Sequence, residues 1–469
     1  MRFIQENKFS LCCLTGLLLW YIVCLLFTPE TPVFVNEEAP VYLPIVCVLS
    51  LVCLSVPTVL YAFSSEFREL KWHRRLLLVS VAMMLTAVIH RPRVYLDVQL
   101  VFWVSAFIAL VADKERSVNR PPLFYYTFWL YFIWQAVTIL WTSNTSEARV
   151  YFNRLVPLFS YSFTFLFIRI EEGQYRALIR LFWRVVCIGC LLTIASLIYE
   201  AQRMSIPLST FLSFGKFGIN GIPVYDILFA WSGSPHPTYN ALWIIAGLIC
   251  SFYLLDRKSL TVFEAVFSWV LVFIVIYVSQ SRVGLVAFGV VCVSGVLFLL
   301  RHQRKWAWGY AGAVAVLTGI IAITRMDTIH SFYADPIRDG LIRVTLDYLH
   351  ADPWRGCGLG GMTFDYVSSV VGYEFKSWWP MFDNISFYPH NQFLGDWMQS
   401  GIIGLVLLCT MMVSLLYESI RQRSFIAFLY LVVVLIIMQI EMPFHILSGT
   451  TIIAFLSCFF LCRQVPKER

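Results

Sequence analysis

Charged residues are scarce in this sequence, because Asp, Glu, Lys and Arg together make up 13% of its 469 residues. In soluble globular domains roughly a quarter of all residues are charged, so the shortage of charge excludes an ordinary soluble domain. The basic residues are dispersed between apolar runs, which argues against a nucleic-acid-binding face. What is abundant is apolar: 59% of the residues are hydrophobic. This composition predicts an all-α protein that crosses a membrane several times.

Motifs for metal ions are also missing. The loops between the apolar runs contain no Asp-x-Asp pair, no His-Glu-x-x-His and no cluster of His and Cys. Cys187 and Cys190 form a Cys-x-x-Cys pair inside an apolar run with no second pair nearby. We interpret them as buried small hydrophobic residues and not as a metal or redox site. The sequence therefore predicts chemistry without a metal ion or another cofactor.

Apolar runs long enough to cross a membrane recur along the whole chain. We predict about fourteen spans, with twelve as the alternative because only Arg91-Pro-Arg93 separates the third run from the fourth. The first run lacks a convincing signal-peptide cleavage site, so we interpret it as a span. The predicted spans are residues 10–28, 41–63, 75–90, 94–112, 123–142, 152–169, 180–199, 240–256, 261–280, 283–300, 306–323, 397–418, 424–441 and 446–462.

The loops predict the orientation of these spans. Six basic connections fall on one side of the membrane, namely residues 64–75, 113–120, 256–259, 301–305, 418–423 and 462–469. Residues 29–40, 142–149 and 441–445 fall on the other side. Because basic loops stay in the cytoplasm, we expect both termini to be cytoplasmic.

Two long segments then lie outside. We divide the chain into spans one to eleven at residues 1–323, with an outer segment at 200–239, a loop domain at 324–395, and C-terminal spans at 396–469. A loop of roughly 70 residues is expected to fold into helices of its own and to carry function. Apolar residues at helical spacing between two Asp-Pro pairs predict a helix from Pro336 to about Ala351.

Several polar side chains are placed on this outer side. Arg282 lies between two spans with almost no loop, where it is either a surface anchor or a cavity residue. Arg338 and Arg343 lie on the predicted loop helix, where each is either an exposed charge or a ligand-binding group. The run Gly356–Gly361 allows a close backbone approach but has no Lys-Ser/Thr, so it is not a phosphate loop.

The stretch from Tyr388 to Gly404 is the most informative one. If Asn391 begins a helix, then Gln392, Asp396 and Gln399 share one face, which should point into the bundle or to water. Pro389 leaves His390 outside the helix or in its first turn, and a lone histidine is more often structural than catalytic. A second, weaker set of cavity candidates precedes another span: His236, Tyr239 and Asn240.

Arginines together with one histidine suit a reaction with an anionic leaving group and a hydroxyl nucleophile. Guanidinium groups bind a diphosphate through charge-assisted, often bidentate bonds. Histidine titrates near neutral pH and can accept the proton of a hydroxyl.

These residues also match a family pattern. His390-Asn391, nine residues and then Gly401-Ile-Ile-Gly404 resemble the H-[NSQ]-x9-G-x-x-[GTY] motif of bacterial O-antigen ligases. The run Ser279-Gln-Ser-Arg282-Val-Gly284 resembles the S-R-x-G element of the wider superfamily, which includes O-antigen polymerases and O-linked protein oligosaccharyltransferases. The loop from Ile337 to Gly360 resembles its pattern of Arg, helix, Pro and G-x-G, which selects Arg338 over Arg343.

The resemblance implies a GT-C-like, metal-independent, inverting glycosyltransferase at the periplasmic face of the bacterial inner membrane. Its donor would be a glycan on undecaprenyl diphosphate and its acceptor a sugar hydroxyl of lipid A–core. His390 would activate the acceptor hydroxyl, and Arg282 and Arg338 would bind the diphosphate. Asn391, Gln392 and Asp396 would line the cavity. The alternatives are an O-antigen polymerase with a second lipid-linked glycan as acceptor, and a flippase for lipid-linked sugars.

Overall fold

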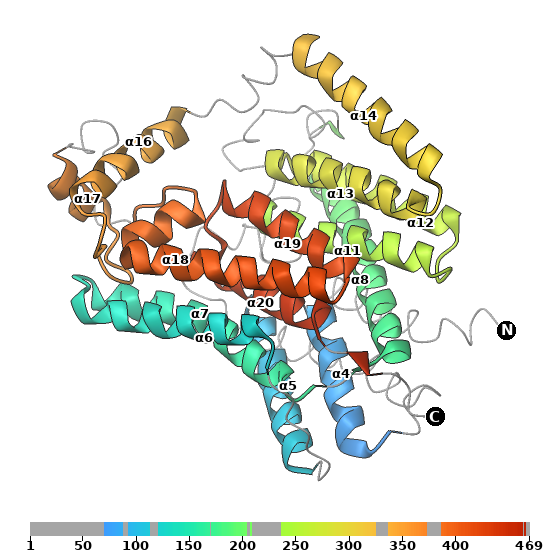
Figure 1. Ribbon diagram of the computed structural model, residues 1–469, viewed down its shortest axis with the longest axis horizontal. Helices are drawn as coiled ribbons and strands as arrows, with labels where there is room; N and C mark the ends of the chain where they lie inside the picture. The colour runs from blue at the N-terminus through green and yellow to red at the C-terminus, as the bar shows by residue number, and fades with distance from the viewer. Residues whose placement is uncertain are drawn as a thin grey trace. The chain divides into compact units, whose positions relative to one another are not determined.

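The computed structural model describes residues 70–87, 92–112, 121–168, 170–203, 207–208, 236–324, 336–372, 386–462 and 464–465. Fourteen α-helices make up most of this described part (Figure 1), with one two-residue strand pair, β1 (Ile170–Glu171) and β2 (Gln464–Val465), in parallel. Five described stretches are long and apolar enough to cross a membrane. The predicted all-α polytopic membrane protein is therefore confirmed at this level.

Helices occupy the positions of the predicted spans. Each of the twelve predictions from residues 75–90 onward coincides with a described helix, whereas 10–28 and 41–63 lie outside the described residues. The five spans by length and composition are Leu123–Trp141, Glu172–Ala195, Pro237–Asp256, Arg282–Leu300 and Gln392–Arg421. Shorter apolar helices account for four more of the predicted positions: Val98–Ala112, Val262–Val278, Phe425–Met438 and Leu447–Phe460.

The helices form two compact units, which we describe separately. The first unit contains β1 and β2 and the helices α4 (Trp72–Ala87), α5 (Pro92–Ala112), α8 (Glu172–Arg203), α11 (Pro237–Asp256), α12 (Val262–Val278) and the first half of α13 (Arg282–Leu300). Helix α8 packs against α4, α11 and α12. A Cβ on Gly247 of α11 would collide with the side chain of Val186 on α8. Glycine therefore permits the close approach of these two helices.

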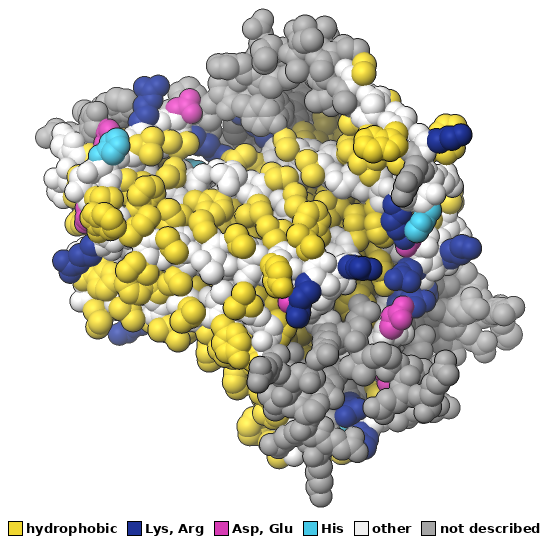
Figure 2. Space-filling view, viewed as in Figure 1, with side chains coloured by type: hydrophobic (Ala, Val, Ile, Leu, Met, Phe, Trp, Pro, Cys, Tyr) yellow, Lys and Arg dark blue, Asp and Glu magenta, His cyan; other side chains and the backbone are white. Residues whose placement is uncertain are grey.

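The second unit contains α6 (Leu123–Thr138), η1 (Ile139–Trp141), α7 (Thr145–Phe165), the rest of α13, α14 (Arg304–Thr324), α16 (Pro336–Ala351), α17 (Phe364–Val371), α18 (Gln392–Arg421), α19 (Phe425–Met438), η3 (Pro443–His445) and α20 (Leu447–Phe460). Helix α18 packs along α6, and α7 packs along α20. Figure 2 shows hydrophobic side chains spread over much of the visible face. Exposed apolar residues at helical spacing on α18, including Val406, Val413 and Ile420, are suited to face lipid.

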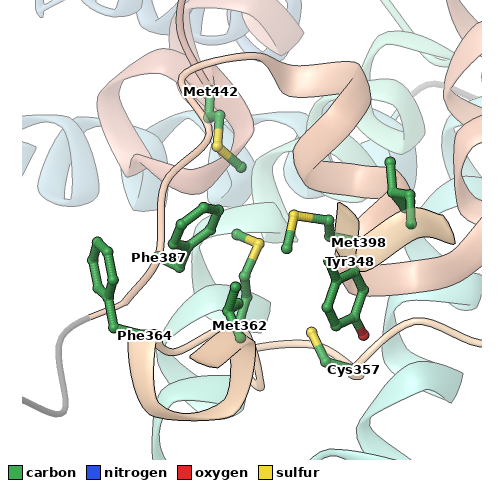
Figure 3. Close-up of a cluster of buried hydrophobic side chains, with 9 residues drawn as sticks. Tyr348, Cys357, Met362, Phe364, Phe387, Met398 and Met442 are labelled. Atoms are coloured by element: carbon green, nitrogen blue, oxygen red, sulfur yellow. The ribbon is translucent and has the colours of Figure 1, made fainter. Parts of the chain in front are cut away.

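The loop before α18 folds onto it through a small core of its own. The predicted loop helix is confirmed as α16, which begins at Pro336 and ends at Ala351. Tyr348 of α16, Phe364 of α17, and Phe387, Met398 and Met442 belong to one buried cluster (Figure 3). Burial of these side chains attaches α16 and α17 to the start of α18 and to the connection between α19 and α20.

Helix α18 is interrupted at Gly401, which has a φ of +68°. The carbonyl oxygens of Met398 and Gln399 would normally accept hydrogen bonds from amides four residues later. Here they accept from the backbone N–H groups of Cys357 and Gly358, at 2.9 and 2.8 Å. The glycine-rich loop thus supplies the hydrogen bonds that the break in α18 removes.

Candidate functional site

Glu441 connects two of the predicted site residues. Its Oε1 lies 3.0 Å from Nη2 of Arg338, and its Oε2 lies 3.3 Å from Nδ1 of His390. A second nitrogen of Arg338, Nη1, donates to the carbonyl of Ile440 at 3.3 Å. The side chain of Glu441 is only 7% exposed, whereas the side chains of its partners are about a third exposed, 33% for Arg338 and 37% for His390. The carboxylate is therefore buried beneath a guanidinium and an imidazole that a ligand can reach.

Local backbone geometry presents His390. Its φ is +49°, a left-handed conformation that is uncommon for a residue other than glycine. The next residue, Asn391, is the N-cap of α18, and its side chain accepts a hydrogen bond from the backbone N–H of Leu394 at 3.1 Å. The side-chain amide of Asn391 also donates to the carbonyl of Gln439 at 3.1 Å. Helix α18 thus begins directly after His390, as the sequence predicts.

The contact with Glu441 determines how His390 can react. A carboxylate only accepts hydrogen bonds, so Nδ1 carries the proton that is donated to Oε2. In the neutral imidazole, Nε2 then holds the lone pair. With this tautomer, Nε2 is the ring nitrogen that can accept a proton, and the contact with Glu441 orients the ring.

Gln392 and Asp396 lie on one polar face of α18, which we call the polar stripe. The stripe contacts the connection between α19 and α20 that carries Glu441, and we call residues 439–446 of this connection the Glu441 segment. Oε1 of Gln392 accepts from the backbone N–H of Phe444 at 2.9 Å, and its Nε2 donates to Oδ1 of Asp396 at 3.1 Å. The hydroxyl of Tyr131 on α6 donates to Oδ2 of Asp396 at 2.7 Å. Both stripe residues are buried. The stripe faces the interior of the unit, where it binds α6 and the Glu441 segment.

Arg343 is not part of this cluster. It lies on α16 as Arg338 does, but five residues along a helix correspond to a rotation of about 140° away from Arg338. Its side chain is exposed. The contact with Glu441 thus involves Arg338 alone of the two arginines.

The remaining predicted residues belong to the first unit. Arg282 is the first residue of α13 and is half-buried. A Cβ on Gly284 would lie 3.0 Å from Cβ of Ala241, so the first turns of α13 and α11 are in contact. In the first turns of α11, Asn240 donates to the carbonyl of His236 at 3.2 Å, and the rings of His236 and Tyr239 lie 4.5 Å apart.

Two residues of the second unit were missed by the sequence analysis: Glu441 and Arg154. Glu441 stood at the end of the predicted span 424–441, where the predicted outer loop 441–445 begins, and Arg154 lay within the predicted span at residues 152–169. The available signal was an ionisable residue at the outer end of an apolar run. Their partners come from distant parts of the chain, so their roles could not be derived from spacing.

Arg154 lies in a cluster of rings next to the Glu441 segment. Its Nη1 donates to the carbonyl of His445 at 2.7 Å, and its Cζ lies 4.9 Å from the centre of the Tyr151 ring. The hydroxyls of Tyr151 and Tyr388 lie 2.6 Å apart. His445 is buried, and Nδ1 has no hydrogen-bond partner in the described part of the chain. Burial, together with the charge of Arg154, lowers the pKa of His445 to about 3.

These features define a polytopic α-helical membrane protein in which one unit combines a histidine, a buried glutamate and an arginine. Residues 267–409 match the family model described as O-antigen ligase. The matched segment contains Arg282, Arg338 and His390, whereas Arg154 and Glu441 lie outside it. The resemblance to O-antigen ligases is thereby confirmed for residues 267–409. A comparison with curated proteins found no match.

Proposed function

We propose that the protein is an O-antigen ligase of the bacterial inner membrane. It transfers a glycan from undecaprenyl diphosphate to a sugar hydroxyl of lipid A–core at the periplasmic face. The observation that carries this proposal is the contact of Glu441 with both His390 and Arg338. One buried carboxylate thereby places a base beside a group suited to bind a diphosphate, and the family match supports the same chemistry.

His390 is the general base of the reaction. The acceptor oxygen forms a bond to the anomeric carbon of the donor sugar while Nε2 of His390 takes up the hydroxyl proton. The bond between the anomeric carbon and the diphosphate oxygen breaks on the opposite face of the sugar, so the configuration inverts. Glu441 stabilises the imidazolium that forms, because the carboxylate accepts from Nδ1.

Arg338 binds the leaving group. Negative charge grows on the diphosphate as the glycosidic bond breaks, and a guanidinium that is already oriented stabilises this charge without reorganising. Glu441 and the carbonyl of Ile440 orient Arg338, and a third of its side chain stays exposed to a ligand. Arg282 is assigned to the same diphosphate through its S-R-x-G element.

The proposed architecture accommodates two lipid substrates. We assign twelve to fourteen spans in a GT-C-like arrangement, with the loop domain at 324–395 on the periplasmic side and both termini in the cytoplasm. Asn391, Gln392 and Asp396 maintain the Glu441 segment through the contacts described above. His236, Tyr239 and Asn240 are proposed to contact the acceptor.

An O-antigen polymerase is the second candidate, because the same donor chemistry can act on another lipid-linked glycan. A flippase is less well supported, since residues 267–409 match a family model that is described as O-antigen ligase.

Reconstitution distinguishes these functions. Purified protein is mixed with lipid-linked glycan and lipid A–core in the presence of a chelator, and the products are separated by size. Capped lipopolysaccharide supports the ligase, whereas elongated lipid-linked glycan without capping indicates the polymerase. We expect His390→Ala to reduce transfer by at least about 100-fold, with thermal unfolding like that of the wild type. Full activity of folded His390→Ala would refute the assigned base.

A further inference from the structure

Arg154 is a cation that lies beside an aromatic ring, that of Tyr151. It lies on α7, within the predicted span at residues 152–169, and its side chain is half-buried. An ionisable residue in such a helix faces the interior of the bundle or a water-filled cavity, because exposure to lipid is costly. The cost is acceptable when a counterion or a ligand compensates the charge.

The described residues supply only weak compensation for this charge. The contacts of Arg154 are the carbonyl of His445 and the face of the Tyr151 ring. Within the described residues no carboxylate forms a salt bridge with Arg154. A carbonyl and an aromatic ring orient a guanidinium, but they do not neutralise it.

The arginine also lies beside the proposed site. His445, which it contacts, is four residues after Glu441, a separation of at most about 14 Å along the chain. On the other side, the Tyr151–Tyr388 hydroxyl contact ties α7 to the residue two positions before His390. Arg154 and the His390–Glu441–Arg338 cluster are therefore held by the same two short segments.

The nearby carboxylate of Glu441 is engaged by other groups. The carboxylate of Glu441 is already shared between Arg338 and His390. Within the described residues Glu441 forms no salt bridge with Arg154, so its carboxylate is not the counterion of this guanidinium.

We infer that Arg154 is a further anion-binding residue of the site and that it binds a phosphate group of a lipid-linked substrate. This inference rests on the proposed function and extends it to a residue outside the matched segment. The guanidinium presents N–H groups in a planar fork that suits phosphate oxygens. The phosphate belongs either to the diphosphate of the donor or to a phosphate carried by the acceptor lipid.

Three variants distinguish anion binding by the charge of Arg154 from a purely structural role of its side chain. Arg154→Gln removes the charge but retains an amide that can donate to a carbonyl, whereas Arg154→Lys retains the charge. Arg149→Gln is the matched control, because Arg149 is an exposed arginine on the same helix. Each protein is purified whole, and its thermal unfolding is recorded so that rates refer to folded protein.

Binding is measured first, without turnover. The full-length protein is titrated with undecaprenyl diphosphate, with undecaprenol as the uncharged probe, and with acceptor lipid before and after phosphatase treatment. We expect Arg154→Gln to weaken one phosphorylated lipid by about tenfold or more, since a hydrogen bond to a charged group is worth at least that factor. Arg154→Lys should restore part of the loss, while Arg149→Gln should leave binding unchanged.

The outcomes assign the phosphate or overturn the inference. Weaker binding of undecaprenyl diphosphate identifies the donor, and weaker binding of only the phosphorylated acceptor identifies the acceptor. In turnover the KM of that same substrate should rise. Two results would overturn the inference. Folded Arg154→Gln could bind both phosphorylated lipids as tightly as the wild type, or it could lose as much affinity for undecaprenol as for the phosphorylated lipids. In either case Arg154 only stabilises the position of the Glu441 segment. Because binding is measured without glycan transfer, failure of the ligase assignment is recognised separately by the absence of capped product.

Discussion

Nδ1 of His390 lies 3.3 Å from Oε2 of Glu441, although 51 residues separate them in the chain. The same carboxylate contacts Arg338 through its other oxygen at 3.0 Å. The proposed base and the proposed diphosphate-binding group therefore contact one buried acid, and variants of Glu441 are the most direct test of the site.

Glu441→Gln should lower the rate of glycan transfer by about 10- to 1000-fold. The amide keeps the size of the side chain but no longer stabilises a charged imidazole, so the base is weakened and loses its orientation. Initial rates at saturating substrate, normalised to folded protein, measure the effect. Asp339→Asn is the matched control, because Asp339 is an exposed carboxylate next to Arg338. Equal rates for wild type and Glu441→Gln would remove Glu441 from the mechanism.

Arg338 and Arg343 form a matched pair on α16. We expect Arg338→Ala to reduce kcat/KM for the donor by about 100-fold or more, because the buried carboxylate of Glu441 loses its guanidinium and the diphosphate loses a ligand. Arg343→Ala should remain within about twofold of the wild type, since its side chain is exposed on another face of the helix. Kinetics with varied donor concentration decide between them, and the reverse order of effects would contradict the site described here.

Gly401→Ala should destabilise the protein by roughly 2 kcal/mol or more. The residue has a φ of +68°, and an added Cβ would collide with the carbonyl oxygen of Trp354. Denaturation followed by tryptophan fluorescence in detergent provides the comparison. In Gly289→Ala, the control, nothing lies within 4 Å of the new Cβ. That variant should be unchanged or more stable by up to about 1 kcal/mol, and equal stability of both variants would argue against a strained break.

His445 should make the stability of the protein sensitive to acid. The pKa of His445 is about 3 in the folded protein because of burial and Arg154, whereas it is near 6.5 in an unfolded chain. Between these values only the unfolded state holds the proton. The free energy of unfolding should therefore decrease as the pH falls from about 6.5 toward 3, by roughly 1.4 kcal/mol per pH unit, and be constant above that window.

Unfolding measured between pH 4.5 and 7.5 tests this dependence. His445→Gln should flatten the slope, whereas His350→Gln should retain it, since His350 is exposed on α16. An unchanged slope in His445→Gln would show that another group titrates in this range.

Local sequence patterns were sufficient to predict the positions of the helices and the places of some single residues relative to them. Apolar runs predicted the positions of twelve described helices, because each span must satisfy its own backbone hydrogen bonds. The two Asp-Pro pairs predicted the limits of α16, and Pro389 predicted that His390 precedes α18. These features depend on neighbours within a few residues, so the sequence contains them directly.

Partners across the fold could not be predicted in this way. Sequence placed His390 and Arg338 on the same side of the membrane, but their common contact with Glu441 arises only where three separate segments meet. The same is true of Arg154. In the sequence it is one residue of an apolar run, and only the tertiary structure gives its contact with the carbonyl of His445. The sequence by itself determined the helical membrane class, the helix positions and the histidine motif, since hydrophobic periodicity and turn residues act locally. The tertiary structure decided which charges meet, because that depends on how the helices and their connections pack.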